Sequence, residues 1–178
     1  MSQYKPLSKI ATTNKHGDWN VIIETPKGNR NKLAYDEDIG VFQLKGVLPS
    51  GAVFPFDFGF LPSTEGGDGD PLDVLLLMDE PTYPGTLVPS RLLGVIEANQ
   101  TEDGKTERND RLIAVAANSR RHGGLQSIQD LNALLLEEIE HFFTSYNLIK
   151  GKRFAVVGRS GPERAQEVIA KAQEKSRP

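Results

Sequence analysis

The sequence predicts an α+β domain in which a small antiparallel β-barrel or sheet comes first and two helices come last. Short apolar runs bounded by Gly, Pro, Asn and Asp fill most of the 178 residues, a pattern typical of strands joined by turns. Near Asp130 the spacing of apolar residues changes to that of a helix. The length suits one domain with a substantial core, and no internal repeat or linker divides it.

The predicted strands are short runs rich in Val, Ile, Leu and aromatic residues. They cover residues 19–24, 32–35, 40–45, 72–78, 86–98, 111–117 and 153–158. Residues 48–63 are dense in Phe, Pro and Gly, and the prolines predict an ordered loop rather than a central strand or a helix. Residues 99–110 are predicted to be a polar connection between two strands.

Two helices are predicted from apolar side chains that recur three and four residues apart. The first covers 130–147, with Asp130 as a candidate N-cap, and the second starts within 160–168, where Pro162 suits the first turn. The apolar stripes are Leu131, Leu134, Leu135, Ile139, Phe142, Phe143 and Tyr146 in the first helix, and Ala165, Val168, Ile169 and Ala172 in the second.

Composition narrows the class of protein. Residues 1–17 are polar and irregular, and we expect them to form a flexible arm or an edge extension before a single domain over 18–178. The absence of cysteine excludes disulfides and thiolate metal sites and suits a reducing compartment. There is no signal-peptide pattern and no run of about eighteen apolar residues, so we expect a cytoplasmic protein without a membrane partner. A net charge of −3 gives no general attraction for nucleic acid.

Three aspartates, Asp68, Asp70 and Asp73, stand close together at the start of an apolar strand. Solvated turn carboxylates are the simplest interpretation, because Asp and Gly are common in turns. Three observations favour a bound cation instead. Asp68 and Asp70 would point to the same side of an extended chain, and Pro71 stiffens the backbone after them. Asp73 lies inside the apolar run, where an unpaired carboxylate costs roughly several kcal/mol.

The types of ligand indicate which ion would bind. An EF-hand loop that began at Asp68 would need an oxygen ligand at its fifth position and a glycine at its sixth. These positions are Leu72 and Asp73, so this kind of calcium site is excluded. Oxygen ligands without His or Cys suit Mg²⁺, with Mn²⁺ as a substitute. Both ions keep several waters and commonly bridge to substrate phosphates, so the cluster favours a phosphate-containing substrate.

The same segment resembles the signature of a known family, the soluble family I inorganic pyrophosphatases. The signature is "DGDPLDVLLL" (68–77), and the resemblance extends over roughly residues 19–160. Further similar segments, in the expected order, are "VIIETPKGNRNKLAYD" (21–36), "FPFDFGFLPST" (54–64), "RLIAVA" (111–116) and "IEHFFTSYN" (139–147). The resemblance implies a five-stranded, OB-like antiparallel β-barrel with two flanking C-terminal helices. It also implies Mg²⁺-dependent hydrolysis of diphosphate to two phosphates and, as in bacterial members, assembly into a homo-oligomer, a hexamer.

The resemblance further implies a role for individual residues. Asp70 would act as the general base that takes a proton from the attacking water. The metal ligands would be Asp68, Asp73, Asp70 and Glu24, with Asp103 and Asp110 from a second acidic cluster. Lys32, Arg111 and Tyr146 would hold phosphoryl oxygens.

This sequence departs from the family pattern at several positions, so it is identified as a divergent member. Gly46 replaces an arginine that grips phosphate, Phe54 and Phe58 replace tyrosines, Ala34 replaces an acidic residue and Asn147 replaces a lysine. Other basic side chains could occupy the space that the missing arginine leaves at Gly46, and the candidates are Arg30, Lys45, Arg108 and Lys27. Of these, Arg30 is included among the expected substrate-binding residues. Each lost charged hydrogen bond removes about 1.5–3 kcal/mol of stabilisation, so reduced activity is one possible result.

The second acidic cluster has an ambiguous register. The family places an aspartate two residues ahead of a phosphate-binding lysine that is Arg111 here, and this position is Asn109, with Asp110 one residue late. Asp103, or else Glu102, would supply the earlier ligand, but the segment 101–110 is longer than usual.

Three other functions stay open at this level. The lost arginine and tyrosines are compatible with another phosphoanhydride or a short polyphosphate as the substrate. A catalytically weakened homologue that only binds metal or phosphate is the second alternative. Binding of single-stranded nucleic acid by the barrel is the third, and the acidic net charge opposes it.

Overall fold

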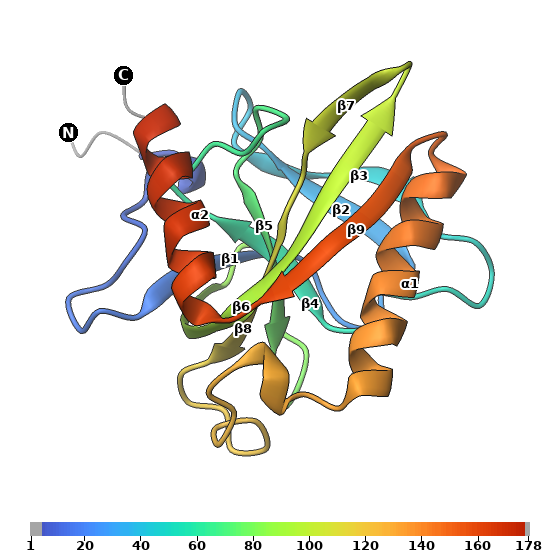
Figure 1. Cartoon of the computed structure of the whole chain (residues 1–178). Coiled ribbons are helices and arrows are strands. Elements are labelled where there is room, and N and C mark those ends of the chain that lie inside the picture. Colours follow the sequence, from blue (N-terminus) through green and yellow to red (C-terminus); the bar gives the residue numbers. More distant parts are fainter. Residues whose placement is uncertain (1–4, 177–178) are drawn as a thin grey trace.

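The computed structural model describes residues 5–176, and five of the strands in this part of the chain close into a barrel (Figure 1). The ring runs β1 (Trp19–Thr25), β4 (Asp57–Leu61), β5 (Leu72–Leu77), β8 (Arg111–Ala116) and β6 (Leu87–Glu102), and β6 pairs again with β1. The predicted α+β class, with a five-stranded OB-like barrel and two late helices, is confirmed. One pair differs from the expected antiparallel pattern, since β5 and β8 run parallel. The chain segment that connects β5 to β8 is long and includes β6, which pairs with β8 on the side away from β5. A connection of this length allows the chain to return and form a parallel pair.

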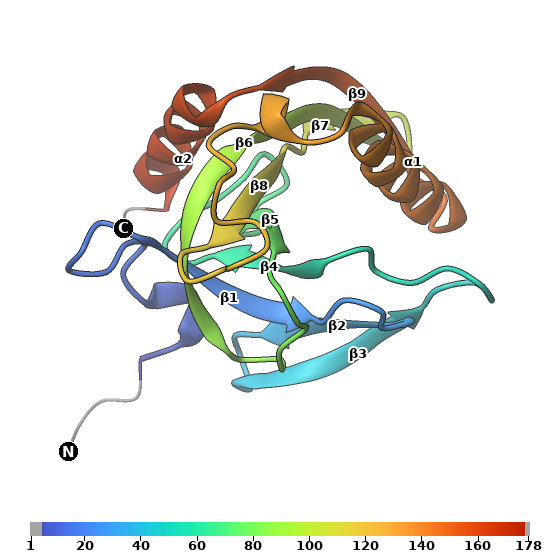
Figure 2. The same cartoon turned by 90° about the horizontal axis from the view of Figure 1, so that it is seen from below.

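Four further strands lie outside the ring. β9 (Arg153–Ser160) and β7 (Lys105–Arg108) both pair with the long strand β6, while β2 (Asn31–Asp36) and β3 (Val41–Val47) form a separate hairpin. Figure 2 shows this hairpin on the side of the barrel away from the two helices, α1 (Ala133–Ile149) and α2 (Pro162–Lys175).

The barrel wall is buried on both faces. Leu75 and Leu77 of β5 belong to the hydrophobic cluster that includes α1, whereas Val74 and Leu76 belong to the cluster that includes α2. Two-sided burial explains why β5 is an unbroken apolar run rather than an alternating one. By the same alternation, Asp73 lies on the face of Leu75 and Leu77.

The segment 48–63 was predicted to be a loop, and this prediction is wrong for its second half, where β4 is a fully buried strand. The prolines that argued against a strand lie outside it, Pro55 before its start and Pro62 after its end. Gly59 allows the close approach of β4 to β1, because a Cβ atom there would lie 1.9 Å from the carbonyl oxygen of Ile22.

Residues 99–110 form a β-hairpin rather than an irregular connection. β6 continues to Glu102, and β7 begins at Lys105. Between them Asp103 and Gly104 both have positive φ angles, 49° and 77°, as a tight two-residue hairpin turn requires. The Asp-Gly pair is a hairpin signal that the sequence carries.

The first helix begins later than predicted, because its N-cap is Asn132 and not Asp130. The Asn132 side chain accepts a hydrogen bond of 2.8 Å from the backbone N–H of Leu134. Asp130 instead ends a 3₁₀ turn, Ile128–Asp130, and its carboxylate accepts hydrogen bonds from the backbone N–H groups of Gln126 and Ser127.

The described part of the N-terminal extension lies against the barrel and α2. Thr12 is buried, its hydroxyl donates to the carbonyl of Pro62 over 3.2 Å, and it accepts a hydrogen bond of 3.0 Å from the side chain of Gln173. Its own carbonyl accepts a hydrogen bond from the backbone N–H of Asn20. Over residues 5–176, no helix has both the length and the apolar character needed to cross a membrane.

Candidate active site

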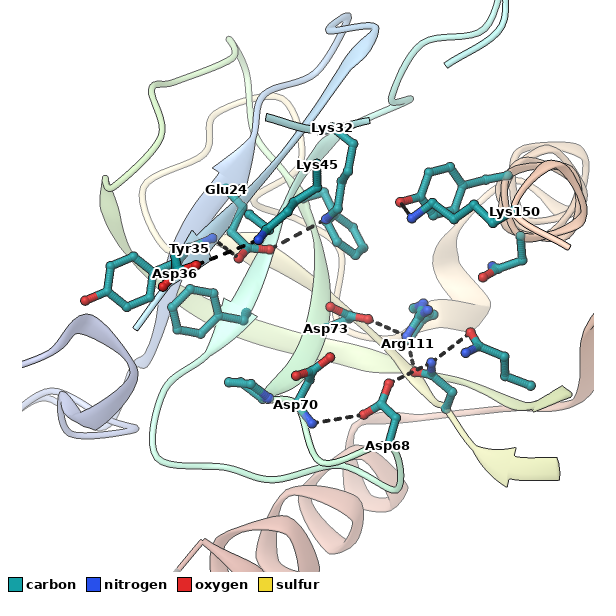
Figure 3. A pocket seen from close by; sticks show the side chains of 18 of the residues that line it. Glu24, Lys32, Tyr35, Asp36, Lys45, Asp68, Asp70, Asp73, Arg111 and Lys150 are labelled. Carbon is teal, nitrogen blue, oxygen red and sulfur yellow. Dashed lines mark hydrogen bonds and ion pairs between the residues drawn. The ribbon is translucent and has the colours of Figure 1, made fainter. Parts of the chain in front are cut away.

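A cavity of about 540 Å³ lies between the β2–β3 hairpin, the barrel and the C-terminal end of α1 (Figure 3). Carboxylates and cations both line it. Seven predicted site residues are among the lining side chains, namely Glu24, Lys32, Asp68, Asp70, Asp73, Arg111 and Tyr146. They come from β1, β2, the loop before β5, β5 itself, β8 and α1. The fold therefore gathers in one place residues that are far apart in the sequence.

The loop before β5 presents Asp68 and Asp70 from a turn, not from the extended chain that we expected. Gly69 has a φ angle of 88°, and the backbone N–H of Asp70 donates to the Asp68 carboxylate over 3.2 Å. Gly67 brings this loop against the end of β7, because a Cβ atom there would lie 2.3 Å from the carbonyl oxygen of Arg108. Both aspartates still face the cavity, although the geometric reason differs.

Asp73 and Arg111 neutralise each other's charge. They are register partners in the parallel pair of β5 and β8, and their side chains form an ion pair of 2.5 Å between Oδ2 and Nη1. The guanidinium carbon lies 5.4 Å from the ring centres of both Phe143 and Phe154, which hold its position. A protein cation therefore compensates the carboxylate that is embedded in the apolar strand.

Asn109, just before β8, connects the aspartates to the arginine. Its side chain donates hydrogen bonds of 3.0 Å to Asp68 Oδ2 and to Gln100 Oε1, and it accepts a hydrogen bond from Arg111 Nη1. Asn109 is buried, and both it and Gln100 line the cavity. Sequence reasoning considered Asn109 only as a doubtful position and missed Gln100.

Three of the predicted site residues do not line the cavity. Asp103 lies exposed at the tip of the β6–β7 hairpin, because β6 runs several residues further than the predicted strand. Asp110 is buried and accepts hydrogen bonds from the backbone N–H of Ala98 (3.0 Å) and from Arg108 Nε (2.6 Å). Arg30 donates to the carbonyl of Leu48 over 2.5 Å and is exposed.

The space at Gly46 is not taken by the expected arginines. Among the described residues beyond its chain neighbours, no heavy atom lies within 4 Å of a Cβ atom built there. Arg108 is held by Asp110 and by Glu97 Oε1, 2.7 Å from Nη2, and Lys27 lies over the ring of Phe56 at 5.2 Å. Of the four candidates, Lys45 alone lines the cavity within the described part of the chain.

Glu24 and Lys32 form the wall nearest the β2–β3 hairpin. Glu24 Oε2 lies 3.6 Å from Lys32 Nζ, and Glu24 Oε1 accepts a hydrogen bond of 2.8 Å from the backbone N–H of Tyr35. Lys32 Nζ also lies 4.2 Å from the ring centre of Phe58 and 5.7 Å from that of Phe54. The rings of Phe58 and Phe54 thus lie beside the lysine ammonium group and stabilise its charge.

Two lysines that sequence reasoning missed, Lys150 and Lys152, also line the cavity. Lys150 follows α1, donates to the hydroxyl of Tyr146 and lies 4.2 Å over its ring. The spacing of four residues from Tyr146 in a helical pattern is the signal that could have found it. Lys152 Nζ forms an ion pair of 2.9 Å with Glu102.

Burial and mutual repulsion shift the pKa values of the acids in the cavity. Burial raises the pKa of Asp68 and of Asp70, and the nearby charge of Asp73 raises both further. Burial also raises the pKa of Glu24 against the opposing effect of Lys32, and it raises the pKa of the Tyr146 hydroxyl. The pKa of Lys150 is lowered to about 8, first by burial and then by the neighbouring charges of Lys32 and Lys152.

The donor set fits a hard divalent cation that keeps most of its water. Among residues 5–176 no three His, Asp or Glu side chains converge closely enough to hold an ion by themselves. Mg²⁺ does not need such a cage, because it is commonly bound by one or two carboxylates, waters and substrate phosphates. In the same residues no Lys or Arg nitrogen lies within 4.0 Å of the Asp68 or Asp70 carboxylate, so both carboxylates remain available as ligands.

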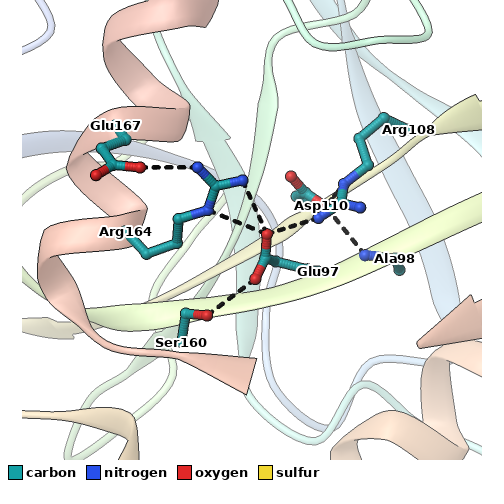
Figure 4. A network of polar contacts seen from close by, with 7 residues as sticks. All are labelled: Glu97, Ala98, Arg108, Asp110, Ser160, Arg164 and Glu167. Atoms are coloured by element: carbon teal, nitrogen blue, oxygen red, sulfur yellow. Dashed lines mark hydrogen bonds and ion pairs between the residues drawn. The ribbon is translucent and has the colours of Figure 1, made fainter. Parts of the chain in front are cut away.

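A network of ion pairs fixes the chain segment that carries Asn109 (Figure 4). Glu97 of β6 accepts hydrogen bonds from Arg108, from Ser160 Oγ and from two guanidinium nitrogens of Arg164 on α2. Burial would raise the pKa of Glu97, but the hydrogen bonds from Ser160 and Arg164 outweigh it and lower the pKa. Because Arg108 also holds Asp110, the residues on both sides of Asn109 are tied to the barrel and to α2.

The chain is similar to known proteins over most of its length. The model of the family described as "Inorganic pyrophosphatase" matches residues 21–177. The inorganic pyrophosphatase of Synechocystis sp. is 39% identical over 152 residues, which cover 85% of this chain and 88% of the relative. The crystal structure of inorganic pyrophosphatase from Thermus thermophilus superposes with a TM-score of 0.87 at 32% identity and covers 97% of this chain and 99% of its own. That of Helicobacter pylori has a TM-score of 0.84 at 30% identity, with 94% and 98% covered.

Proposed function

The chain belongs to the inorganic pyrophosphatase family, and on this premise we propose that it hydrolyses inorganic diphosphate to two phosphates with Mg²⁺ as cofactor. The observation that carries the proposal is the gathering of Asp68, Asp70 and Asp73 with Lys32 and Arg111 in one cavity. Carboxylates to hold cations and cations to hold phosphate are both required, because diphosphate repels an anionic nucleophile.

The acidic residues divide into ligands and a base in this proposal. Bound Mg²⁺, with Mn²⁺ as a substitute, lowers the pKa of a coordinated water and offsets the charge of the phosphates. Asp68, Asp70, Asp73 and Glu24 would supply the ligand oxygens. Asp70 accepts the proton of the attacking water, a role that its raised pKa supports because a stronger base takes the proton more readily.

The basic residues bind and orient the phosphoryl groups. Lys32 lines the cavity from β2 and Arg111 from β8, and Tyr146 lines it from α1. The Nε of Arg111 is a buried donor without a partner among the described residues, so this guanidinium keeps unused donor capacity beside the substrate space.

Further lysines replace the phosphate donors that the chain lacks. Lys45 of β3 lies one residue before Gly46, and Lys150 lies less than one helical turn beyond Asn147. Both line the cavity with Lys152. We propose that Lys45, Lys150 and Lys152 supply the positive charge lost at Gly46 and Asn147.

The test is release of phosphate from diphosphate with and without Mg²⁺, in the wild type and in Asp70→Asn. We expect the substitution to lower kcat by about 10²–10⁴-fold, the usual contribution of a general base. Asp18→Asn, on the surface outside the cavity, is the matched control and is expected to keep full activity. No phosphate release by the wild type with Mg²⁺ or Mn²⁺ would overturn the proposal and favour a homologue that only binds metal or phosphate.

A second candidate substrate is another phosphoanhydride or a short polyphosphate. The cavity volume of about 540 Å³ and the spread of cations from Lys45 to Lys152 favour a longer chain of phosphates. A substrate panel that compares kcat/KM for diphosphate, triphosphate and a nucleoside triphosphate decides between the two. A higher kcat/KM for either of the longer substrates would replace diphosphate as the substrate.

Location and assembly belong to the same proposal. We propose a cytoplasmic protein, supported by the absence of cysteine, and a homo-oligomer, a hexamer by family resemblance, with no nucleic-acid or membrane partner. Apolar side chains of the β2–β3 hairpin, Ile39, Val41, Leu44 and Val47, are exposed and support association. Sedimentation of the purified protein tests the oligomeric state, and a monomer at micromolar concentration would contradict it.

A further inference from the structure

We propose that the side-chain amides of Asn109 and Gln100 limit the substrate-free protein to a single bound divalent cation. This inference rests on the proposed function, since it concerns how the same cavity takes its metal. It goes beyond that function because it assigns the limit to two neutral residues. Asn109 stands where the family resemblance predicts a metal-binding aspartate, and Gln100 is its hydrogen-bond partner on the cavity wall.

The contacts of Asn109 determine which way its amide points. Arg111 can only donate hydrogen bonds, so the oxygen of Asn109 must face it. The NH₂ group then faces Asp68 Oδ2 and Gln100 Oε1, each 3.0 Å away, and both of these atoms are acceptors. Every contact is chemically consistent, so this amide orientation is specified by the structure.

This orientation removes ligand capacity from the cavity. The Asn109 NH₂ group occupies one oxygen of Asp68 and cannot itself bind a cation. The Asn109 oxygen accepts a hydrogen bond from Arg111, and the Gln100 oxygen accepts one from Asn109, so each of these hydrogen bonds uses one of the two lone pairs of an uncharged oxygen. A carboxylate at either position would instead offer negative charge and a second oxygen.

The charges of the cavity side chains also indicate a limit of one divalent cation in the absence of substrate. Arg111 neutralises Asp73, and Lys32 lies 3.6 Å from Glu24. Within the aspartate cluster, Asp68 and Asp70 have no Lys or Arg nitrogen of the described residues within 4.0 Å. Asp38 also lines the cavity without such a partner among residues 5–176, but it lies in the turn between β2 and β3 and is not part of this cluster. The combined charge of Asp68 and Asp70 balances that of a single divalent cation. Further cations would have to enter with phosphate groups, which bring their own negative charge.

The test is the number and affinity of Mn²⁺ ions bound without substrate, measured by titration calorimetry and by the spin-resonance signal of free Mn²⁺. The variants are Asn109→Asp, Gln100→Glu and the double change. Asn99→Asp is the matched control, because residue 99 is adjacent to residue 100 in β6 but points to the opposite face and does not line the cavity.

We expect the wild type and Asn99→Asp to bind a single ion. Asn109→Asp and Gln100→Glu are expected to bind an additional ion, or the first ion about 10-fold more tightly or better. Without metal, Asn109→Asp should melt at a lower temperature than the wild type, because two carboxylates then stand about 3 Å apart, and Mn²⁺ should reverse the loss. A change in packing alone would not alter the stoichiometry.

The outcomes separate the inference from the proposed function. If the wild type binds two or more ions without substrate, or if the variants match it in number and affinity, the inference is overturned while diphosphate hydrolysis is unaffected. If Asn109→Asp does not fold, Gln100→Glu, which is only half-buried, gives the same comparison. If ion binding follows the expected pattern but no phosphate is released from diphosphate, the proposed function fails and the inference on the amides stands.

Discussion

Asp73 and Arg111 face each other across the parallel strands β5 and β8, with 2.5 Å between Oδ2 and Nη1. The Arg111 side chain is 5% exposed and the Asp73 side chain is 25% exposed. The positive charge that the aspartate cluster requires is therefore supplied in part by the protein itself. The same ion pair contributes to the cavity and to the stability of the barrel.

Arg111→Met should leave the Asp73 carboxylate without its partner in a largely buried place. We expect the free energy of unfolding, measured by urea denaturation in metal-free buffer, to fall by about 3 kcal/mol. Mg²⁺ should restore part of it, because a divalent cation would neutralise Asp73. Arg121→Met breaks an exposed ion pair with Glu80 (3.5 Å) and should cost less than about 1 kcal/mol. Equal losses in the two variants would contradict this role for Arg111.

Gly67→Ala should displace the aspartate loop without unfolding the barrel. A Cβ atom would lie 2.3 Å from the backbone oxygen of Arg108, so the loop must move away and take Asp68 from Asn109. We expect Mn²⁺ affinity to fall by about 10-fold or more and stability to fall by about 1–3 kcal/mol. Gly124→Ala, where nothing lies within 4 Å, is the control. Unchanged Mn²⁺ affinity would show that the close contact does not position Asp68.

Lys150 should make the binding of diphosphate sensitive to alkaline pH. Its pKa is lowered to about 8, so the side chain is protonated below this pH and loses its charge above it. The KM of the wild type should therefore rise above about pH 8. In Lys150→Arg the guanidinium stays charged, so the part of the rise due to this residue should disappear.

The neutral variant Lys150→Met should show a raised KM already at pH 7, by about 10-fold or more for one lost charged hydrogen bond. Lys15→Met, on the exposed N-terminal segment, serves as the control. Identical pH profiles of KM for the wild type and Lys150→Arg would exclude a contact between Lys150 and the substrate.

Asp79 should contribute to stability in the acid range. Its carboxylate accepts hydrogen bonds from Ser119 Oγ (2.6 Å) and from the backbone N–H groups of Arg120 and Arg121 (3.0 Å each). These contacts, led by the one from Ser119, lower its pKa from 3.8 to about 2. A lowered pKa in the folded state means stability that is present above 3.8 and is lost as the pH falls toward 2.

Thermal melts of Asp79→Asn against the wild type test this directly. At pH 7 the variant should melt at a lower temperature, and the difference should shrink as the pH approaches 2. Asp18→Asn, outside this loop, provides the control. A difference that is constant over the whole acid range would mean that ionisation of Asp79 is not its cause.

Most strands could be predicted because their apolar patterns are local properties of the chain. β4 could not, since Pro55 and Pro62 signal loop on either side of it, and only the pairing with β1 and β5 makes it a strand. The parallel pairing of β5 with β8 is likewise set by the order in which the barrel closes. No local sequence pattern encodes that order.

The aspartate loop could be proposed from the sequence because Asp68, Asp70 and Asp73 are adjacent and chemically distinctive. Gln100 could not, because its place on the cavity wall depends on how far β6 extends before the Asp103–Gly104 turn. Lys150 and Lys152 reach the cavity only because α1 ends beside it. The local aspartate motif thus predicted the chemistry of the site. Gln100, Lys150 and Lys152 reach the cavity only through the tertiary structure, and no sequence motif marks the segments that carry them.

The hydrogen bond between Thr12 and Gln173 joins residues that are 161 positions apart, and the cavity itself is lined by residues from Ser8 to Lys152. During synthesis Asp68 and Asp70 leave the ribosome well before Asn109, Arg111 and Lys150. Contacts between such distant segments form slowly, because a long loop must close before any of them is made. The carboxylates therefore remain exposed to water until the second half of the chain arrives, and the recovery of activity on refolding reports the final closure of the molecule rather than its early collapse.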